Sequence, residues 1–258
     1  MTDHLPTPTP GTAIGRLRLT IAGRPVELTF PDSADMRQSL QRIMAGEEYR
    51  IPRLMGYSPA VIIDIGANVG ASALFFHAGY PDAQVYCYEP SPTNFAFLQQ
   101  NLAFSNRFHV FPYGLLDRDG EVRLYVGRHQ WMQNSVIPNN ETGDAFEWVT
   151  LRRAGAELTE RGLVDVSILK LDTEGCEVPI LEDLRPWLPR LDFLYLEYHC
   201  EQDRRAMDRL LEPDFVVFAA CATRAHRGTV AYVSNGMASR FPVFNARRIE
   251  SPPQAAEG

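Results

Sequence analysis

The stretch 61–70, which reads VIIDIGANVG, constrains the fold of this chain more than any other. It begins with β-branched residues, which are typical of a strand buried on both faces of a parallel sheet. Asp64 follows them, and Gly66, Asn68 and Gly70 then alternate ahead of an apolar segment with a helical pattern. A strand that runs through small residues into a helix brings backbone N–H groups close to a ligand. A tight turn without any ligand looks the same, so this turn alone assigns no function.

A second predicted strand, 84–88, ends at Glu89, about 20 residues beyond the glycines, where nucleotide-binding α/β units carry an acidic residue. A carboxylate there can accept hydrogen bonds from both hydroxyls of a ribose. The glycine pattern departs from the dinucleotide fingerprint, because Asn68 stands where a second glycine would admit a pyrophosphate. The pattern Asp64-x-Gly66-x-Asn68-x-Gly70 instead resembles the first motif of the class I S-adenosylmethionine (SAM) methyltransferases. SAM carries no pyrophosphate, so it is the cofactor we expect.

Composition narrows the classes of partner. The net charge of −7 and the lack of long Lys/Arg runs argue against a nucleic-acid backbone as the main partner. No stretch reaches the roughly 18 apolar residues of a membrane span, and the first residues lack the apolar region of a signal peptide. The four cysteines form no C-x-x-C pair, so neither a zinc site nor a disulfide framework is indicated. These features predict a cytoplasmic protein that binds a small molecule, with no membrane partner. The oligomeric state stays open, a homo-oligomer included.

The predicted elements divide the chain into four parts. Residues 1–13 are rich in Pro and Thr and are expected to form a disordered tail. Residues 14–56 predict a hairpin followed by a helix that begins at Ser33. Residues 57–241 are expected to form the SAM-binding methyltransferase domain that the resemblance of the first motif implies, and residues 242–258 a second tail. We interpret the extension 14–56 as a cover over the cofactor side of the sheet.

Within the predicted domain, strands alternate with helices, and two final strands, 215–221 and 229–234, are joined by a short turn. This order predicts an α/β fold of the Rossmann-like class I methyltransferase type. The sheet should be mostly parallel and twisted, with an antiparallel edge strand and helices on both faces. The polar stretch 128–148 is long for a connection inside a compact domain, so we expect a lid or a binding loop there.

Polar residues follow the ends of two further predicted strands. Asp172 and Glu174 end one of them, and Glu197 and His199, two residues apart and so on one face, end the other. Ligands of open α/β sheets bind outside the carboxyl ends of the strands. Simpler roles exist, since carboxylates cap helices and a single histidine is more often a satisfied polar residue. The convergence of all four beside the glycine turn favours a functional role.

Four segments together resemble the FkbM-type methyltransferases: VIIDIGANVG, YEPSPTNFAFLQQN, DRDGEVRLYV and ILKLDTEGCEVPIL. The family consists of class I SAM-dependent enzymes, many of which O-methylate hydroxyls of sugars and of secondary metabolites. The resemblance spans roughly residues 45–220. It implies that Gly66 and Gly70 shape the turn at the methionine end of SAM and that Glu89 holds the ribose. The cofactor-binding set that we expect is Asp64, Gly66, Asn68, Gly70, Glu89, Pro90 and Asp172.

O-methylation needs a base within reach of the acceptor hydroxyl. His199 is the first candidate, because the unperturbed pKa of histidine lies near neutrality. Asp172 is the second, and Glu174 belongs to the same catalytic set. A divalent cation held by Asp172, Glu174 and Glu197 or His199 would instead lower the pKa of the hydroxyl, an arrangement that we do not favour. The residues expected to contact the acceptor are Trp131, Asn134 and Glu197.

Two other functions remain open on the sequence. A nicotinamide-dependent Rossmann oxidoreductase would share the strand, turn and helix, although Asn68 and the lack of a second nucleotide-binding half count against it. A SAM-binding module without catalysis would keep the turn but would not need the four polar residues at the strand ends. The sequence therefore favours a SAM-dependent O-methyltransferase that acts on a small-molecule hydroxyl.

Overall fold

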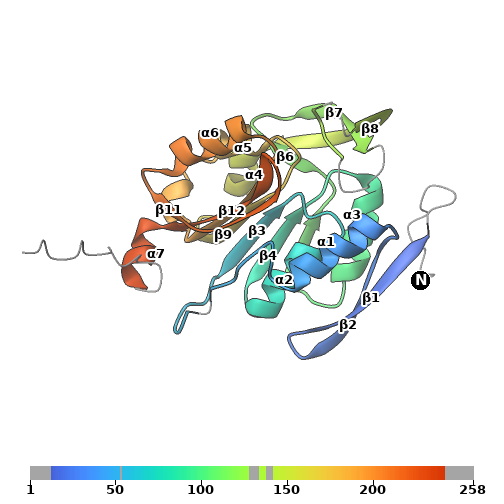
Figure 1. The fold of residues 1–258 in the computed structure, drawn as a ribbon, viewed down its shortest axis with the longest axis horizontal. Helices are drawn as coiled ribbons and strands as arrows, with labels where there is room; N and C mark the ends of the chain where they lie inside the picture. The colour runs from blue at the N-terminus through green and yellow to red at the C-terminus, as the bar shows by residue number, and fades with distance from the viewer. Residues whose placement is uncertain (1–12, 53, 128–133, 138–141, 242–258) are drawn as a thin grey trace, which may run out of the picture.

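The computed structural model describes residues 13–52, 54–127, 134–137 and 142–241. A twisted sheet runs through the centre of the molecule, and helices cover both of its faces (Figure 1). The two predicted tails lie outside the described residues except for Ala13, and so does Trp131. This arrangement confirms the predicted α/β class.

Within the described residues, the central sheet has seven strands in the order β11-β12-β10-β9-β3-β4-β5. The strands from β10 to β5 run parallel to one another, whereas β12 runs antiparallel to both of its neighbours. The predicted antiparallel pair, β11 with β12, is therefore present at one edge of the sheet. The strand that runs opposite to its neighbours is β12, which lies one place inside the edge strand β11. In chain order, these strands are β3 (Val61–Ile65), β4 (Gln84–Tyr88), β5 (Phe108–Phe111), β9 (Val166–Leu171), β10 (Phe193–Tyr198), β11 (Phe215–Arg224) and β12 (Arg227–Ser234).

Two hydrophobic cores form because successive side chains of a strand point to opposite faces of the sheet. Ile62 belongs to one core, with side chains of the helices on that face, and Ile63 belongs to the other. Fully burying one such side chain stabilises the fold by about 1.5–3 kcal/mol. The helices of the first face are α1 (Ala34–Met44), α2 (Ala71–Gly79), α3 (Pro92–Leu102) and α7 (Asn235–Arg240). Those of the second are α4 (Ala154–Glu160), α5 (Glu177–Asp183), the short 3-10 helix η1 (Leu188–Arg190) and α6 (Glu201–Leu211).

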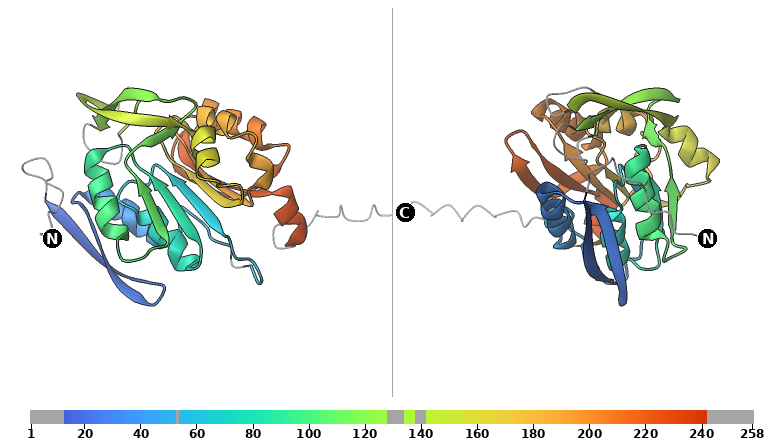
Figure 2. Two further views of the ribbon diagram at one scale, coloured as in Figure 1. Left: turned by 180° about the vertical axis from the view of Figure 1, so that it is seen from behind. Right: turned by 90° about the vertical axis from the view of Figure 1, so that its right-hand side faces the viewer.

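The N-terminal extension packs against the first face. Its hairpin pairs β1 (Ile14–Ile21) with β2 (Arg24–Pro31) and lies outside α2 and α3 (Figure 2). The buried side chain of Asn101 accepts a hydrogen bond from the backbone N–H of Thr29 and donates one to its carbonyl oxygen, at 2.9 and 2.8 Å. Helix α1 begins after Ser33, whose hydroxyl oxygen accepts a bond from a backbone N–H of the first turn, as predicted. The extension and the central sheet share one hydrophobic core. The predicted boundary between the extension and the methyltransferase domain, after residue 56, stays a prediction.

A second, three-stranded sheet lies above the carboxyl ends of the central strands. It consists of β6 (Gly114–Leu116), β7 (Gly120–Gly127) and β8 (Thr142–Arg153), in the order β6-β8-β7 among the described residues. The prediction of an irregular stretch over 128–148 is wrong from Thr142 onward, because β8 begins there and pairs with β7. Ser135 also pairs with β7, through Tyr125.

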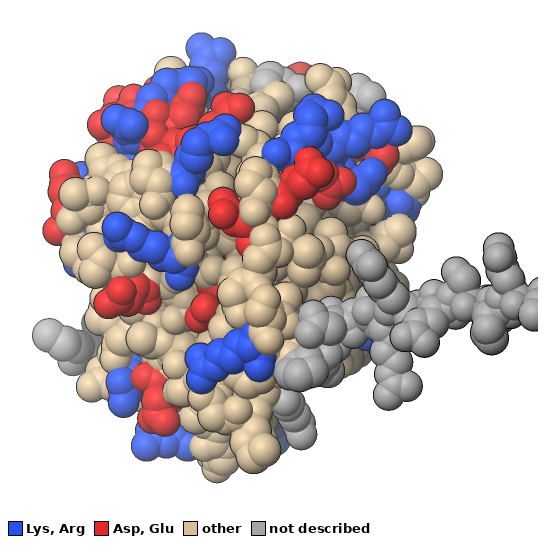
Figure 3. Space-filling model, turned by 90° about the vertical axis from the view of Figure 1, so that its left-hand side faces the viewer, with Lys and Arg blue, Asp and Glu red and all other residues tan. Residues whose placement is uncertain are grey.

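Surface charge and helix length are two further features of the fold. Acidic and basic side chains are mixed on the face shown in Figure 3 and are not separated by sign. In the parts of the chain that the structure describes, every helix is too short or too polar to span a membrane.

Candidate functional site

The glycine turn is held in a conformation that only small residues permit. Gly66 has a φ of +80°, and a Cβ atom at this position would lie 1.8 Å from the carbonyl oxygen of Asp172. The backbone N–H groups of Gly66 and Ala67 both donate to the carbonyl oxygen of Tyr88, at 3.0 Å. Asn68 has a φ of +49°, a left-handed conformation that asparagine tolerates better than most residues. The turn is therefore packed closely between the ends of β4 and β9.

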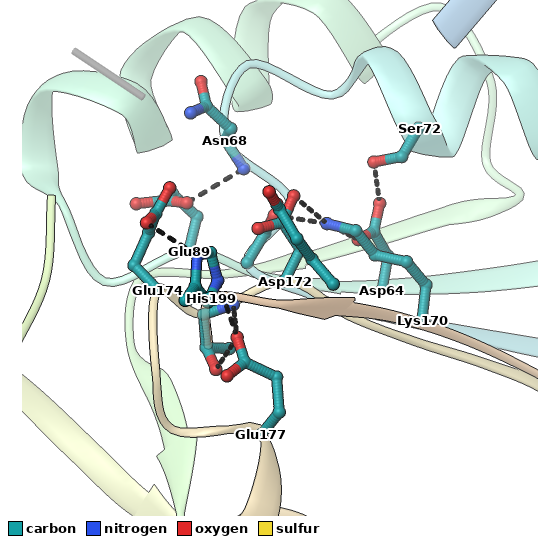
Figure 4. A network of polar contacts seen from close by, with 12 residues as sticks. Asp64, Asn68, Ser72, Glu89, Lys170, Asp172, Glu174, Glu177 and His199 are labelled. Carbon is teal, nitrogen blue, oxygen red and sulfur yellow. Dashed lines mark hydrogen bonds and ion pairs between the residues drawn. The ribbon is translucent and has the colours of Figure 1, made fainter. Parts of the chain in front are cut away.

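Lys170, the only lysine in the sequence, lies on β9 and stabilises this turn. Its ammonium group lies 3.0 Å from a carboxylate oxygen of Asp64 (Figure 4). It also donates to the carbonyl oxygen of Gly66 at 2.7 Å. Burial opposes the charge, but Asp64 and Asp172 outweigh burial and raise the pKa of Lys170 above its usual value. The hydroxyl of Ser72 donates to the other carboxylate oxygen of Asp64. Asp64, predicted to contact the cofactor, thus lies beneath the turn and stabilises it.

Glu89 lies beside the turn. It is the residue that we expect to hold the ribose of the cofactor. Its two carboxylate oxygens accept hydrogen bonds from the backbone N–H groups of Asn68 and Ser91, both at 2.9 Å. Burial raises the pKa of Glu89 to about 7, and these two N–H groups oppose that rise. Each carboxylate oxygen has more than one lone pair, so Glu89 retains acceptor capacity for a ligand.

The turn opens into a cavity of about 340 Å³. Its walls come from the extension, the turn, the carboxyl ends of the strands and the second sheet. Of the predicted cofactor residues, those that line it are Gly66, Asn68, Glu89, Pro90 and Asp172. Gly70 does not line it; with a φ of +92° it is the N-cap residue just before α2, and a Cβ atom there would lie 3.0 Å from a methyl carbon of Leu98. Of the other predicted residues, those that line the cavity are Asn134, Glu174 and Glu197.

At the far end of the cavity, a polar cluster gathers the predicted catalytic residues. Potential ligand atoms of Asp172, Glu174, Glu197 and His199 lie within 4.8 Å of one another. Arg227, at the start of β12, enters the same cluster. Its guanidinium donates to both carboxylate oxygens of Glu174, at 2.8 and 3.0 Å, and to Glu197 at 3.1 Å. The guanidinium of Arg227 therefore already neutralises part of the negative charge of these carboxylates.

The carboxyl groups of the cluster differ in their readiness to ionise. Burial opposes ionisation of Asp172, but Lys170 and the neighbouring Glu197 outweigh burial and hold the pKa of Asp172 below its usual value. Burial, together with the Asp172 carboxylate, raises the pKa of Glu197 well above its usual value. Burial also raises the pKa of Glu174 to about 7, although His199 and Arg227 oppose that rise. Within this pair, Asp172 therefore favours the anionic form more strongly than Glu197 does.

His199 lies behind the cluster and, among the described residues, is not part of the cavity wall. Its ring nitrogens are each 3.4 Å from a carboxylate oxygen, one of Glu174 and one of Glu177. Burial lowers the pKa of His199, but these two carboxylates outweigh burial and raise it above its usual value. Glu177 in turn accepts hydrogen bonds from the backbone N–H groups of Thr173 and Gly175. The structure therefore brings His199 to the predicted catalytic acids but not to the cavity.

Sequence reasoning missed four charged residues of this site: Glu48, Lys170, Glu177 and Arg227. The role of Lys170 could have been predicted from the sequence, because a lysine inside an otherwise apolar strand needs a buried carboxylate as its partner. Arg227 comes close only through the pairing of β12 with β10, and Glu48 only through the packing of the extension. No local motif marks either residue.

Known proteins with similar sequences were found for much of the chain. The family model described as "Methyltransferase FkbM domain" matches residues 64–217, more than half of the chain. The chain is 27% identical over 164 residues to the 2-O-methyltransferase NoeI of Sinorhizobium fredii, covering 58% of this chain and 67% of that protein. It is 29% identical over 159 residues to the hexuronic acid methyltransferase AglP of Haloferax volcanii, covering 58% of this chain and 61% of that protein.

Among solved structures, the chain is similar to the methyltransferase FkbM of Methylobacillus flagellatus. The TM-score is 0.50 and the identity 17%, over 73% of this chain and 47% of that one. This likeness shows the fold. The chain spans about two thirds of the length of the two curated relatives and about half of the crystallised protein.

Proposed function

The chain belongs to the FkbM methyltransferase family, and on that premise we propose that it transfers the sulfonium methyl group of SAM to a hydroxyl of a small molecule. The observation that carries this proposal is the single cavity that joins Glu89, beside the glycine turn, to Asp172 and Glu197 at the strand ends. One end suits a nucleoside and the other a hydroxyl that must lose a proton.

The residues around the turn fit SAM. The carboxylate of Glu89 is a suitable acceptor for ribose hydroxyls. The side-chain oxygen of Asn68 is buried and accepts no hydrogen bond from the described residues, so it can accept one from a ligand. The cavity volume, about 340 Å³, lies in the range of small-molecule sites. When bound, SAM supplies a methyl group on a positively charged sulfur.

The residues of the chain then have to position the acceptor and take its proton. Positioning alone supplies much of the rate in a displacement of this kind. Asp172 and Glu197 lie on the cavity wall and are proposed to contact the acceptor, together with Asn134, whose side-chain oxygen accepts a hydrogen bond from the backbone N–H of Gly127 at the end of β7. His199 is proposed to act through Glu174, since it lies behind the wall. The acceptor is proposed to be a sugar or a secondary metabolite, and the hexuronic acid named for one relative favours a sugar.

We propose further that the reaction needs no divalent cation. The four residues that could form a metal site include Glu174 and Glu197, and both are engaged by Arg227. A Mg²⁺ ion would have to displace this guanidinium or bind beside it against charge repulsion. Arg227 therefore takes the place of a metal in balancing the carboxylates.

Isothermal titration and a transfer assay together test the proposed function. We expect SAM and S-adenosylhomocysteine to bind and NAD not to bind. We expect labelled methyl groups of SAM to appear on at least one member of a panel of methyl glycosides and glucuronides. Binding of NAD in place of SAM would restore the oxidoreductase alternative. Binding of SAM without transfer to any hydroxyl would instead favour a module without catalysis.

A further inference from the structure

The N-terminal extension places a carboxylate in the cavity, opposite the strand ends. Glu48 follows α1 and lines the cavity, with 13% of its side chain exposed. The carbonyl oxygen of Glu48 accepts a hydrogen bond from the hydroxyl of Thr229 at 3.2 Å. Thr229 lies on β12, directly opposite Glu197 in the strand register. The extension is thus fixed over the polar cluster.

This position is far from the end of the cavity that holds Glu89. Strand β12 is separated from β4, which Glu89 follows, by β10, β9 and β3. At about 4.8 Å per strand, the two strands are about 19 Å apart. Glu48 therefore belongs to the acceptor end, and Glu89 to the cofactor end.

The backbone on which Glu48 stands is firmly anchored. The next residue, Tyr49, is buried, and its ring lies 5.8 Å from that of Phe76 and 6.0 Å from that of Tyr195, measured between ring centroids. Aromatic contacts of this kind hold a chain segment in one place. A side chain on such a support is preorganised for a substrate that enters the cavity.

The carboxylates at the strand ends are engaged by other groups, and that of Glu48 is held more loosely. Glu174 and Glu197 accept hydrogen bonds from Arg227, and Asp172 shares a side-chain hydrogen bond with Glu197 and lies 3.7 Å from the ammonium group of Lys170. The carboxylate of Glu48 lies 3.8 Å from the guanidinium of Arg42, beyond hydrogen-bond distance. Of these acids, Glu48 is the one whose oxygens are best placed to receive a new proton.

Burial and the neighbouring charges bring the pKa of Glu48 close to neutral pH, where a carboxylate can accept a proton and later release it. Burial and, next, the carboxylate of Asp172 raise the pKa of Glu48 to about 7, while Arg42 and Lys170 lower it and Glu47 raises it further. Across the cavity, Arg227 is occupied by Glu174 and Glu197. General bases work best when their pKa lies near the working pH. The other acids of the cluster are already engaged, Glu174 and Glu197 by Arg227, and Asp172 by Lys170 and Glu197.

We propose that Glu48 is the general base that takes the proton of the acceptor hydroxyl, a role that rests on the methyl transfer proposed above. The O–H bond of the acceptor breaks and its proton passes to a carboxylate oxygen of Glu48. The electron pair left on oxygen forms the new O–C bond as the C–S bond breaks, and the pair of that bond stays on sulfur. The extension is then part of the catalytic site as well as a cover.

The test compares Glu48→Gln with Glu47→Gln. Glu47 is the matched control, because it also lies near Arg42, at 3.9 Å, but 62% of its side chain is exposed. With SAM saturating and the acceptor glycoside that the wild type uses best, we expect Glu48→Gln to lower kcat by about 10²–10⁴-fold. The acidic limb of the pH–rate profile, near pH 7, should disappear with it. Glu47→Gln should keep both the rate and the limb.

A second readout does not depend on turnover. A carboxyl whose pKa is higher in the folded state than in the unfolded state makes the folded state less stable as pH rises between the two values. The urea midpoint of the wild type should therefore fall between pH 4.5 and about 7. Glu48→Gln should reduce that fall, and Glu47→Gln should not.

Three outcomes separate this proposal from the proposed function. A Glu48→Gln variant with near-native kcat and an intact acidic limb would overturn the base assignment while leaving methyl transfer standing. A rise in KM with unchanged kcat would also overturn it, and would make Glu48 a binding residue. A wild type that binds SAM but methylates no hydroxyl would overturn the proposed function, and the role of Glu48 with it.

Discussion

The ammonium group of Lys170 and the carboxylate of Asp64 form an ion pair of 3.0 Å across two adjacent parallel strands, where the two residues are direct partners in the register. The exposed fractions of the two side chains are 2% and 0%, so water screens neither charge. The same ammonium group holds the carbonyl oxygen of Gly66, at the start of the glycine turn. The shape of the cofactor end therefore depends on a charge pair inside the sheet.

Replacing Lys170 by Met should lower the free energy of unfolding by about 3–5 kcal/mol, because Asp64 is left buried without its partner. The double variant Asp64→Asn/Lys170→Met should recover part of this loss, since the buried charge is then gone. The control is Arg16→Met, which breaks the exposed pair with Glu27 and should cost at most about 1 kcal/mol. Urea unfolding measures all three. A loss equal to that of the control would show that the buried pair contributes little.

Gly66→Ala should abolish SAM binding, because the new Cβ atom meets a backbone oxygen at 1.8 Å and forces the turn to move. Gly162→Ala is the matched control, since Gly162 has a similar φ of +66° and a Cβ atom added there would meet no other atom within 4 Å. Both variants should lose stability through backbone strain, and only the first should lose SAM affinity in isothermal titration. Native affinity in Gly66→Ala would show that the turn is not part of the cofactor site.

Glu89→Ala should weaken SAM binding several-fold to a hundredfold, the effect of losing hydrogen bonds to a charged group worth about 1.5–3 kcal/mol. The wild type should also bind SAM more weakly as pH falls below about 7, because the carboxyl is then protonated. Glu89→Gln should flatten that dependence. Glu121→Ala, on the exposed part of β7, controls for loss of a carboxylate elsewhere. Affinity that is insensitive to Glu89 would place the ribose somewhere else.

His199→Asn should lower kcat modestly and leave the acidic limb of the pH–rate profile in place, because the imidazole is not part of the cavity wall. Its raised pKa also predicts a change in stability. The protonated ring stabilises the folded state fully below pH 6.5, its unperturbed pKa, and this contribution is lost as pH rises through the higher folded value. The variant should lack that loss in urea unfolding. A kcat lowered by 10²-fold or more, with the limb abolished, would make His199 the base after all.

Exhaustive chelation should leave methyl transfer unchanged, because Arg227 already balances Glu174 and Glu197. The measurement is the initial rate after treatment with EDTA, compared with the rate after Mg²⁺ is returned. A rate that falls with chelation and recovers with Mg²⁺ would contradict the metal-free reaction.

The sequence was most informative where one local pattern determines one local structure. The β-branched run and the alternating small residues predicted β3 and its turn, and the acid after the next strand predicted Glu89 at the cavity. The hairpin and capped helix of the extension were equally readable, because turn and capping residues act within a few positions.

The rest depended on contacts between distant segments. Arg227 reaches Glu174 only because β12 inserts between β10 and β11. Glu48 reaches the cavity only because Tyr49 packs into the core of the first face. Conversely, Asp64 and His199 had the right chemistry and the right strand ends, but their orientation toward buried partners is decided by Lys170 and Glu177. The position of a residue along a strand predicts the end of the sheet at which it lies. It does not predict which neighbouring side chain binds it.

The burial of Lys170 has a consequence for chemical modification. Because it is the only lysine in the sequence, the folded chain presents no lysine amine to solvent within its 258 residues. Acylating reagents react with neutral, accessible amines, and Lys170 is both charged and enclosed. Lysine-directed labels, acetylation and ubiquitin attachment should therefore reach this side chain only when the sheet opens. The rate at which a labelling reagent captures it would report directly on how often the centre of the molecule unfolds.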